Sequence, residues 1–213
     1  MDISASFTLF AGQVSTPWPN KAPSAIAKSK CVGRTRLTKT GLVNDAQADL
    51  NAHGGMEKAL HHYPADHYFA WRAELGENTR FRPGGFGENI STRGLTEEDV
   101  CIGDIFSLGT ARVQISQGRQ PCWKLSAHTG EDRMAYLVRR TLRTGWYYRV
   151  LEEGHLTPGE NITLIDRDPR ARTVKEVTRA FFHPRLDPGT ARELAEIETL
   201  FPGWRKSFAE RGE

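Results

Sequence analysis

Residues 104–124 of the chain read DIFSLGTARVQISQGRQPCWK. Residues 104–108 and 111–117 are rich in β-favouring side chains, and the pair Gly109-Thr110 separates them. This arrangement is typical of a β-hairpin. The second arm leads into Arg119-Gln-Pro-Cys122. The sequence therefore predicts a strand that carries a cysteine motif just beyond its end.

Cys122 has the surroundings of a reactive thiol. It lies between Arg119 and Lys124, and nearby cations favour the thiolate, the form that attacks electrophiles and binds metals. Pro121 fixes the backbone just before it. The competing interpretation is a small buried apolar side chain, the role of most cysteines outside disulfides. Local chemistry leaves both interpretations open.

The residues around the hairpin predict a strand-rich domain with a few helices. Up to Asp168 the chain favours short strands broken by glycine and proline, which indicates a mainly β, α+β fold rather than a doubly wound sheet. We expect a barrel-like domain with inserted helices. Further strands are expected at 6–14, 25–37, 145–151 and 161–166, and helices at 56–62, 64–75 and after a capping box at 129–132.

The composition changes at Asp168-Pro-Arg170, after which every pattern is helical. Thr173 and Glu176 form a capping box, and Asp187 is an N-cap acid before a first-turn proline. Three short helices bury little apolar surface alone, so we expect them to pack on the main domain or on a second subunit. The expected domains are residues 1–170, with a core motif region of about 24–167, and residues 171–213.

Composition excludes several classes of protein. The chain has 213 residues, and 29 basic against 26 acidic residues give a net charge of +3, too small for a protein that coats a nucleic acid polymer. No apolar run is long enough to span a membrane, and the first residues, MDISASFTLFAGQV, lack the basic region of a secretory signal. Three cysteines without CxxC spacing argue against a disulfide framework, and we expect a cytoplasmic, reducing compartment. We assign Cys31 and Cys101 to packing.

Two glycine-containing segments are candidates for the walls of a ligand site. His53-Gly-Gly allows close backbone approach to a ligand, and Lys58 follows in the first turns of the expected helix. The adjacent His61-His62 pair lacks HExxH spacing, so a zinc site is not favoured. Residues 83–89, PGGFGEN, do not join a strand to a helix, which favours a cavity wall over a phosphate-binding loop. Glu88 there is a single acid without a partner, a weak candidate for acid–base catalysis.

Four segments, taken in order, resemble MOSC-domain proteins and especially the YiiM-type subgroup. The C-terminal residues resemble the small three-α domain that follows MOSC in that subgroup. Asn44 and Met56-Glu57 depart from the usual residues in two loops and leave the cysteine motif unchanged. The four segments are KSKCVGRTRLTKTGLVNDAQAD at 28–49, HGGMEKALHHYPADHYFAW at 53–71, FGENISTRGLTEEDVCIGDIF at 86–106 and VQISQGRQPCWKL at 113–125.

The resemblance implies a fold that binds the molybdenum cofactor, with Cys122 as the catalytic residue and as the thiolate ligand of molybdenum. Soft thiolates suit this metal, and basic groups suit the phosphate of the pterin. It also implies reduction of N-hydroxylated compounds, such as N-hydroxylaminopurine bases. The candidate cofactor-binding residues are Lys28, His53, Lys58, Asn89, Arg119 and Cys122.

Partners and alternatives follow from the same pattern. The sequence contains no flavin or iron–sulfur motif, so we expect a separate reductase as the electron donor and a small-molecule substrate. The sequence is also compatible with a homodimer. The alternative function is a carrier of the cofactor or of sulfur that uses Cys122 without redox turnover. A third is an interaction module whose helical tail docks a partner.

Overall fold

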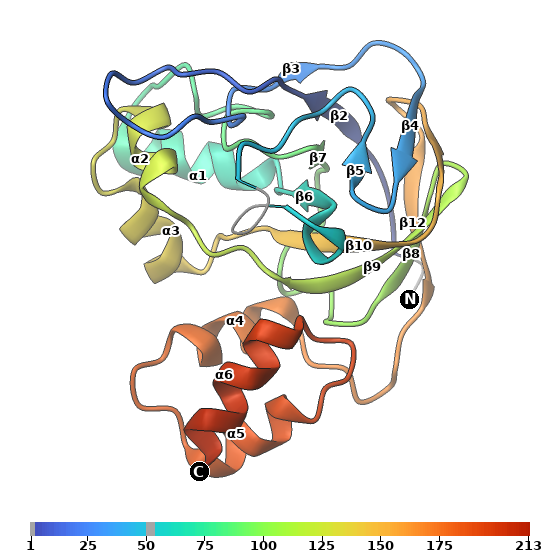
Figure 1. The fold of residues 1–213 in the computed structure, drawn as a ribbon, viewed down its shortest axis with the longest axis vertical. Coiled ribbons are helices and arrows are strands. Elements are labelled where there is room, and N and C mark those ends of the chain that lie inside the picture. The colour runs from blue at the N-terminus through green and yellow to red at the C-terminus, as the bar shows by residue number, and fades with distance from the viewer. Residues whose placement is uncertain (1–2, 50–53) are drawn as a thin grey trace.

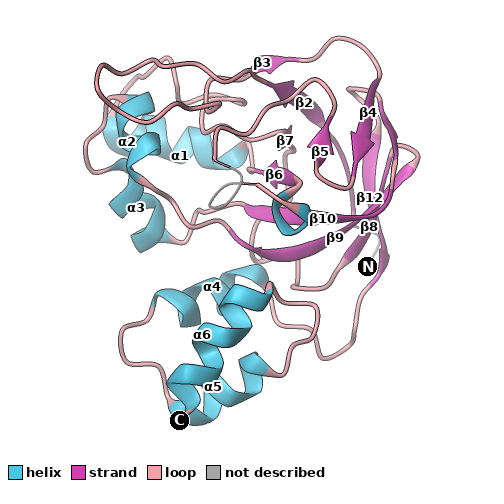
Figure 2. Ribbon diagram, in the orientation of Figure 1, coloured by secondary structure: helices cyan, strands magenta, loops and turns pink. Residues whose placement is uncertain are grey.

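A curled nine-stranded sheet forms the centre of the fold in the computed structural model, which describes residues 3–49 and 54–213 (Figure 1). Within these residues all strand pairs of the sheet are antiparallel except β6 with β7. The expected α+β, barrel-like architecture with inserted helices is confirmed (Figure 2). In order across the sheet the strands are β1 Ser4–Ser6, β12 Asn161–Asp166, β8 Ile105–Leu108, β9 Ala111–Gly118, β10 Trp146–Glu152, β6 Leu60–His62, β7 Ile90–Ser91, β2 Thr8–Ala11 and β3 Ser29–Lys30. A smaller sheet contains β11 Gly154–Leu156, β4 Thr35–Thr38 and β5 Gly41–Leu42.

The hairpin that the sequence predicts over residues 104–117 is the pair β8–β9. Its register runs from Ile105 opposite Gln114 to Leu108 opposite Ala111. Gly109 at the turn has a φ of 56°, a conformation that glycine adopts without steric cost. Strand β9 continues to Gly118 and pairs with β10 on its other side. The hairpin therefore lies at the middle of the sheet and fixes the start of the cysteine motif.

The helix expected over residues 56–62 is wrong in its second half. A single 3₁₀ turn, η1, spans Met56–Lys58, and residues Leu60–His62 form strand β6. All three strand residues are buried and pair with the aromatic strand β10, His62 opposite Trp146. Pairing with an adjacent strand outweighs local helix preference here, because β structure is decided by its neighbours.

The helix boundaries near the cysteine motif also differ from expectation. Helix α2 (Trp123–Thr129) begins directly after Cys122, and no sequence pattern predicted it. The capping box expected at 129–132 is wrong: Thr129 ends α2, and its hydroxyl donates to the Leu125 carbonyl. Helix α3 (Met134–Thr141) begins without a side-chain cap. Helices α1 (Asp66–Leu75), α2 and α3 surround a second small core, which contains Tyr63, Tyr68, Trp71, Phe86, Leu125, Met134 and Val138.

Three helices at the C-terminal end pack against the sheet (Figure 1): α4 (Val174–Phe182), α5 (Pro188–Ala195) and α6 (Pro202–Gly212). The capping box of Thr173 with Glu176 and the N-cap at Asp187 are both present, as the sequence predicts. Trp204 and Phe208 belong to the same buried cluster as the sheet residues, so packing on the main domain is confirmed. Among the described residues no helix combines the length and apolar character that crossing a membrane requires.

Candidate functional site

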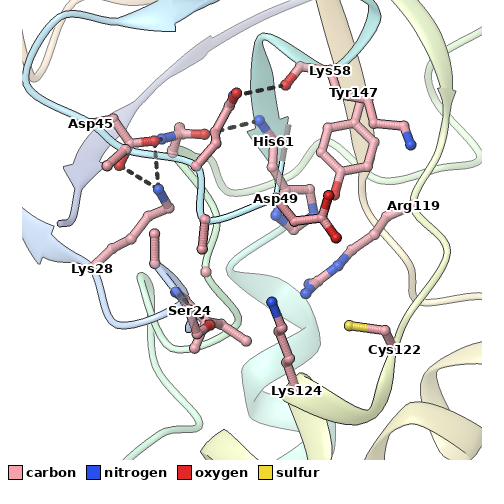
Figure 3. A pocket seen from close by; sticks show the side chains of 17 residues that line it. Ser24, Lys28, Asp45, Asp49, Lys58, His61, Arg119, Cys122, Lys124 and Tyr147 are labelled. Atoms are coloured by element: carbon pink, nitrogen blue, oxygen red, sulfur yellow. Dashed lines mark hydrogen bonds and ion pairs between the residues drawn. The ribbon is translucent and has the colours of Figure 1, made fainter. Parts of the chain in front are cut away.

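Cys122 lies in a cleft of about 620 Å³, counted to its open mouth, beside the end of β9 (Figure 3). Its walls come from the β9–α2 segment, the chain around residues 24–28 and 45–49, and the turn η1 with β6. A concave site where several polar side chains converge is typical of a place that binds a cofactor or small molecule. The polar and reactive residues that line it are Lys28, Asp45, Asp49, Lys58, His61, Asn89, Arg119, Cys122, Lys124 and Tyr147.

The thiol of Cys122 is placed by the transition from strand to helix. It lies four positions after Gly118, the last residue of β9, and it occupies the N-cap of α2 with extended backbone. The Cys122 carbonyl accepts a hydrogen bond from the Leu125 N–H at 3.0 Å, which starts the helix. Its side chain is partly buried and forms no disulfide. Figure 3 shows Arg119 and Lys124 on the same side of the cleft as Cys122, so the cationic flanks that the sequence predicts are present in space.

Arg119 is the most informative side chain of the cleft. It is only 7% exposed, and its backbone N–H donates to the Gly145 carbonyl on the way into β10. Its Nη1 is buried and has no hydrogen-bond partner among residues 3–49 and 54–213. An unpaired buried donor is costly and rare in folded proteins, the more so on a charged group. The cleft therefore presents a cationic donor that a ligand acceptor would satisfy.

Lys28 and Asn89 both meet Asp45 on the opposite side of the cleft. Lys28 Nζ lies 2.5 Å and 2.6 Å from the two carboxylate oxygens of Asp45, and both side chains are almost fully buried. The Asn89 amide donates to the same carboxylate at 2.8 Å. Burial lowers the pKa of Lys28, and Asp45 acts in the opposite direction. Asp45 neutralises much of the Lys28 charge, so Arg119 and Lys124 present more unopposed positive charge to a ligand.

Lys124 and Lys58 supply two further cations. Lys124 Nζ donates to the Pro23 carbonyl at 2.8 Å, which ties α2 to the segment in front of it. Lys58 ends the turn η1 and lines the cleft. Burial lowers the pKa of Lys58, and the carboxylate of Asp49 acts in the opposite direction. These amines and Arg119 give the cleft a positive character suited to phosphate oxygens.

The two adjacent histidines have different surroundings because alternate residues of a strand face opposite sides. His61 faces the cleft, with its ring 5.1 Å from that of Tyr147. Burial and the charge of Arg119 hold the pKa of His61 well below its usual range, so the ring is neutral at pH 7. His62 lies in the core, where its ring nitrogens meet Tyr148 Oη at 3.0 Å and Thr92 Oγ1 at 2.8 Å. The pair therefore does not act as a joint metal ligand.

Five of the six predicted cofactor-binding residues line this one cleft: Lys28, Lys58, Asn89, Arg119 and Cys122. The sixth, His53, lies outside the described residues. Glu88 is buried in the glycine-rich turn, where it accepts from the N–H groups of Gly84 and Phe86, so its role there is structural. Sequence reasoning missed Asp45 and Tyr147, which reach the cleft only through folding of distant segments. Within residues 3–49 and 54–213 no group of three His, Cys, Asp or Glu side chains is arranged to hold a metal ion.

The comparisons with known proteins agree with this architecture. Residues 49–163 match the MOSC domain, and residues 173–211 match the YiiM-like, 3-alpha helix domain. The chain belongs to the MOSC family, in the group that carries this helical domain.

Individual relatives cover most of the chain. Protein YiiM of Escherichia coli (strain K12) is 37% identical over 204 residues, which cover 95% of this chain and 90% of that protein. The crystal structure of YiiM from Geobacillus stearothermophilus has a TM-score of 0.84 at 30% identity and covers 99% of this chain and 100% of that one. A Gibberella moniliformis protein named reductase is 39% identical over 158 residues, 73% of this chain but 28% of its own length.

The MOSC family is associated with the molybdenum cofactor, and the residues of the cleft fit this group. The thiol of Cys122 is the soft ligand type that molybdenum takes. Arg119 Nη1, which is buried and finds no partner among the described residues, is the kind of donor that a phosphate oxygen satisfies. Both groups line the same cleft.

Proposed function

We propose that the protein is a molybdenum-cofactor-dependent oxidoreductase that reduces N-hydroxylated compounds, such as N-hydroxylaminopurine bases. The observation that carries this proposal is that one positively charged cleft holds both the Cys122 thiol and the buried Arg119 Nη1, for which the described residues supply no hydrogen-bond partner. The relative named reductase supports the reaction class. The carrier hypothesis predicts the same binding residues without turnover, so activity separates the two.

Different residues of the cleft would bind different parts of the cofactor. Cys122 would ligate molybdenum through its sulfur, and Arg119 with Lys124 would hold the phosphate of the pterin. Lys28 and Asn89 would support the wall through Asp45. When bound, the cofactor supplies the two-electron redox chemistry.

Polar groups of the cleft would supply protons for the proposed reaction. Reduction of an N–OH group to N–H consumes two electrons and two protons and releases water, and the electrons would come from a separate reductase. Tyr147 lines the cleft, and burial raises the pKa of its hydroxyl, so it keeps its proton at neutral pH. His61 beside it is neutral, as its lowered pKa requires. Tyr147 would therefore hold a proton near the substrate without adding charge.

The test compares protein made in cofactor-sufficient and cofactor-deficient cells. We expect both preparations to fold alike, because no described residue of the main buried cluster lines the cleft. Only the first should contain near-stoichiometric molybdenum and reduce N-hydroxylaminopurine with an artificial electron donor. Equal turnover by the cofactor-deficient protein contradicts the proposal. Molybdenum without turnover supports the carrier function instead.

A further inference from the structure

The C-terminal domain reaches one of the cations of the cleft through Phe201. This residue caps α6 and donates its N–H to the Ser116 carbonyl of β9 at 2.9 Å. Its ring lies under the ammonium group of Lys58, with Nζ 5.2 Å from the ring centroid. Lys58 lines the cleft, so the helical domain contacts a cleft cation although it contributes no residue to the cleft lining.

The backbone turn that carries Lys58 is tied to the same C-terminal segment. The guanidinium of Arg149, on β10, holds the carboxylate of Glu57 through Nε at 2.9 Å and 3.1 Å. Its Nη1 donates to the Thr199 carbonyl at 2.8 Å. The Ser116 hydroxyl donates to the Glu57 carbonyl at 2.6 Å. Residues 199–201 therefore support both the backbone and the charged end of the η1 turn.

An aromatic face beneath an ammonium group restricts a flexible side chain. Lysine carries its charge on a long stem with many rotamers, and the electron-rich face of a ring attracts the charged form. The ring of Phe201 also favours the charged state of Lys58 against the effect of burial, which lowers the pKa of that amine. A cation held in place before a ligand arrives binds an anion more tightly than a mobile one.

We propose that Phe201 is a positioning residue for anion binding, and that the three-helix domain holds Lys58 toward the cleft for phosphate-bearing ligands. The domain thus has a part in ligand binding as well as in packing. The proposal concerns anion binding alone and is separate from redox turnover, so its test needs neither molybdenum nor an electron donor.

The test measures pyrophosphate affinity by calorimetry on the full chain from cofactor-deficient cells. Phe201→Leu keeps an apolar side chain but removes the ring, and we expect affinity to fall about three- to tenfold, the range of a partly desolvated cation–π contact. Phe201→Tyr keeps the ring and should bind like the wild type. Phe182→Leu is the matched control, since it removes the ring under Arg139 in the same domain at 4.9 Å. It should leave the affinity unchanged.

A double-mutant cycle separates positioning from general loss of structure. In a Lys58→Met background, Phe201→Leu should cause no further loss of pyrophosphate affinity, because the two residues act through one contact. If Phe201→Leu does not fold, Phe201→Met replaces it in the same cycle. Equal losses in both backgrounds, wild-type affinity in Phe201→Leu, or no measurable binding by the wild type would each overturn the proposal.

Discussion

Arg119 is the residue whose substitution best separates a role in folding from the proposed role in ligand binding. Its buried Nη1 has no hydrogen-bond partner in the described part of the chain, which is unfavourable for folding. We expect Arg119→Met to leave the cofactor-deficient protein as stable as the wild type, or more stable by up to about 1 kcal/mol. Pyrophosphate affinity should fall in the same variant.

Urea unfolding and calorimetry on the same samples check this prediction. The control is Arg112→Met, which removes an exposed partner of Glu152 and should change the free energy of unfolding by less than about 1 kcal/mol. A large loss of stability in Arg119→Met, with affinity retained, would show that the guanidinium serves the fold rather than a ligand.

His62 makes stability depend on pH. Burial lowers the pKa of His62 from 6.5 to about 3. Between these two pH values the His62 ring is protonated in the unfolded chain and neutral in the folded chain. Stability should therefore fall as the pH drops from 6.5 toward 3, by about 1.4 kcal/mol per pH unit from this residue. His62→Gln should flatten this dependence. The partly exposed His155, changed to Gln, provides the control.

Denaturant unfolding at a series of pH values measures the slope. An unchanged slope in His62→Gln would assign the acid sensitivity to other groups. Burial also lowers the pKa of His61 and that of His128, the latter to about 4, so a residual slope is expected.

Site residues that are close together in the sequence could be predicted, whereas those that only folding brings together could not. Cys122, Arg119 and Lys124 lie within six positions of one another, so their chemistry is visible in the chain itself. The Lys28–Asp45 pair joins residues 17 apart in irregular segments, and nothing in their spacing predicts that one charge cancels the other. Tyr147 belongs to an aromatic run that is typical of residues packed in a core. It reaches the cleft because β10 pairs with β6.

Among the secondary-structure elements, the end of β9 and helix α4 approach each other closely at Gly118. A Cβ built on Gly118 would lie 2.1 Å from Thr178 Oγ1, so only glycine permits this approach. We expect Gly118→Ala to destabilise the protein by roughly 1–3 kcal/mol, because the helix must move away. Gly33→Ala is the control, since its added Cβ would meet no atom within 4 Å.

Thermal unfolding of the two variants checks the contact. Wild-type stability in Gly118→Ala would mean that α4 shifts without cost. Because Gly118 immediately precedes Arg119, this variant should also weaken pyrophosphate binding.

The predictions of helices and strands that were wrong share one physical cause. The caps at Thr173 and Asp187 were predictable because a helix start is a local pattern of hydrogen bonds. The strand at 60–62 was not, since it depends on a partner more than 80 residues away. The pattern at 129–132 resembles a cap, but its threonine hydroxyl bonds backward into α2.

The whole molecule shares one main core. Val174, Leu200, Trp204 and Phe208 of the C-terminal part belong to the same buried cluster as sheet residues such as Ile115. We therefore expect a single cooperative unfolding transition, with equal calorimetric and van't Hoff enthalpies, rather than separate melting of two domains. Two resolved transitions would contradict this. Removal of residues 172–213 should expose sheet surface and lower stability.

The proposed function depends on Cys122 as the ligand of molybdenum. The most direct measurement is molybdenum content and N-hydroxylaminopurine reduction for Cys122→Ser, Cys31→Ser and Cys101→Ser, prepared together from cofactor-sufficient cells. A serine oxygen is a harder ligand than a thiolate, so Cys122→Ser should lose turnover even where some cofactor stays bound. The other two variants should keep full specific activity. Full activity in Cys122→Ser, or equal losses in all three, would contradict the assignment.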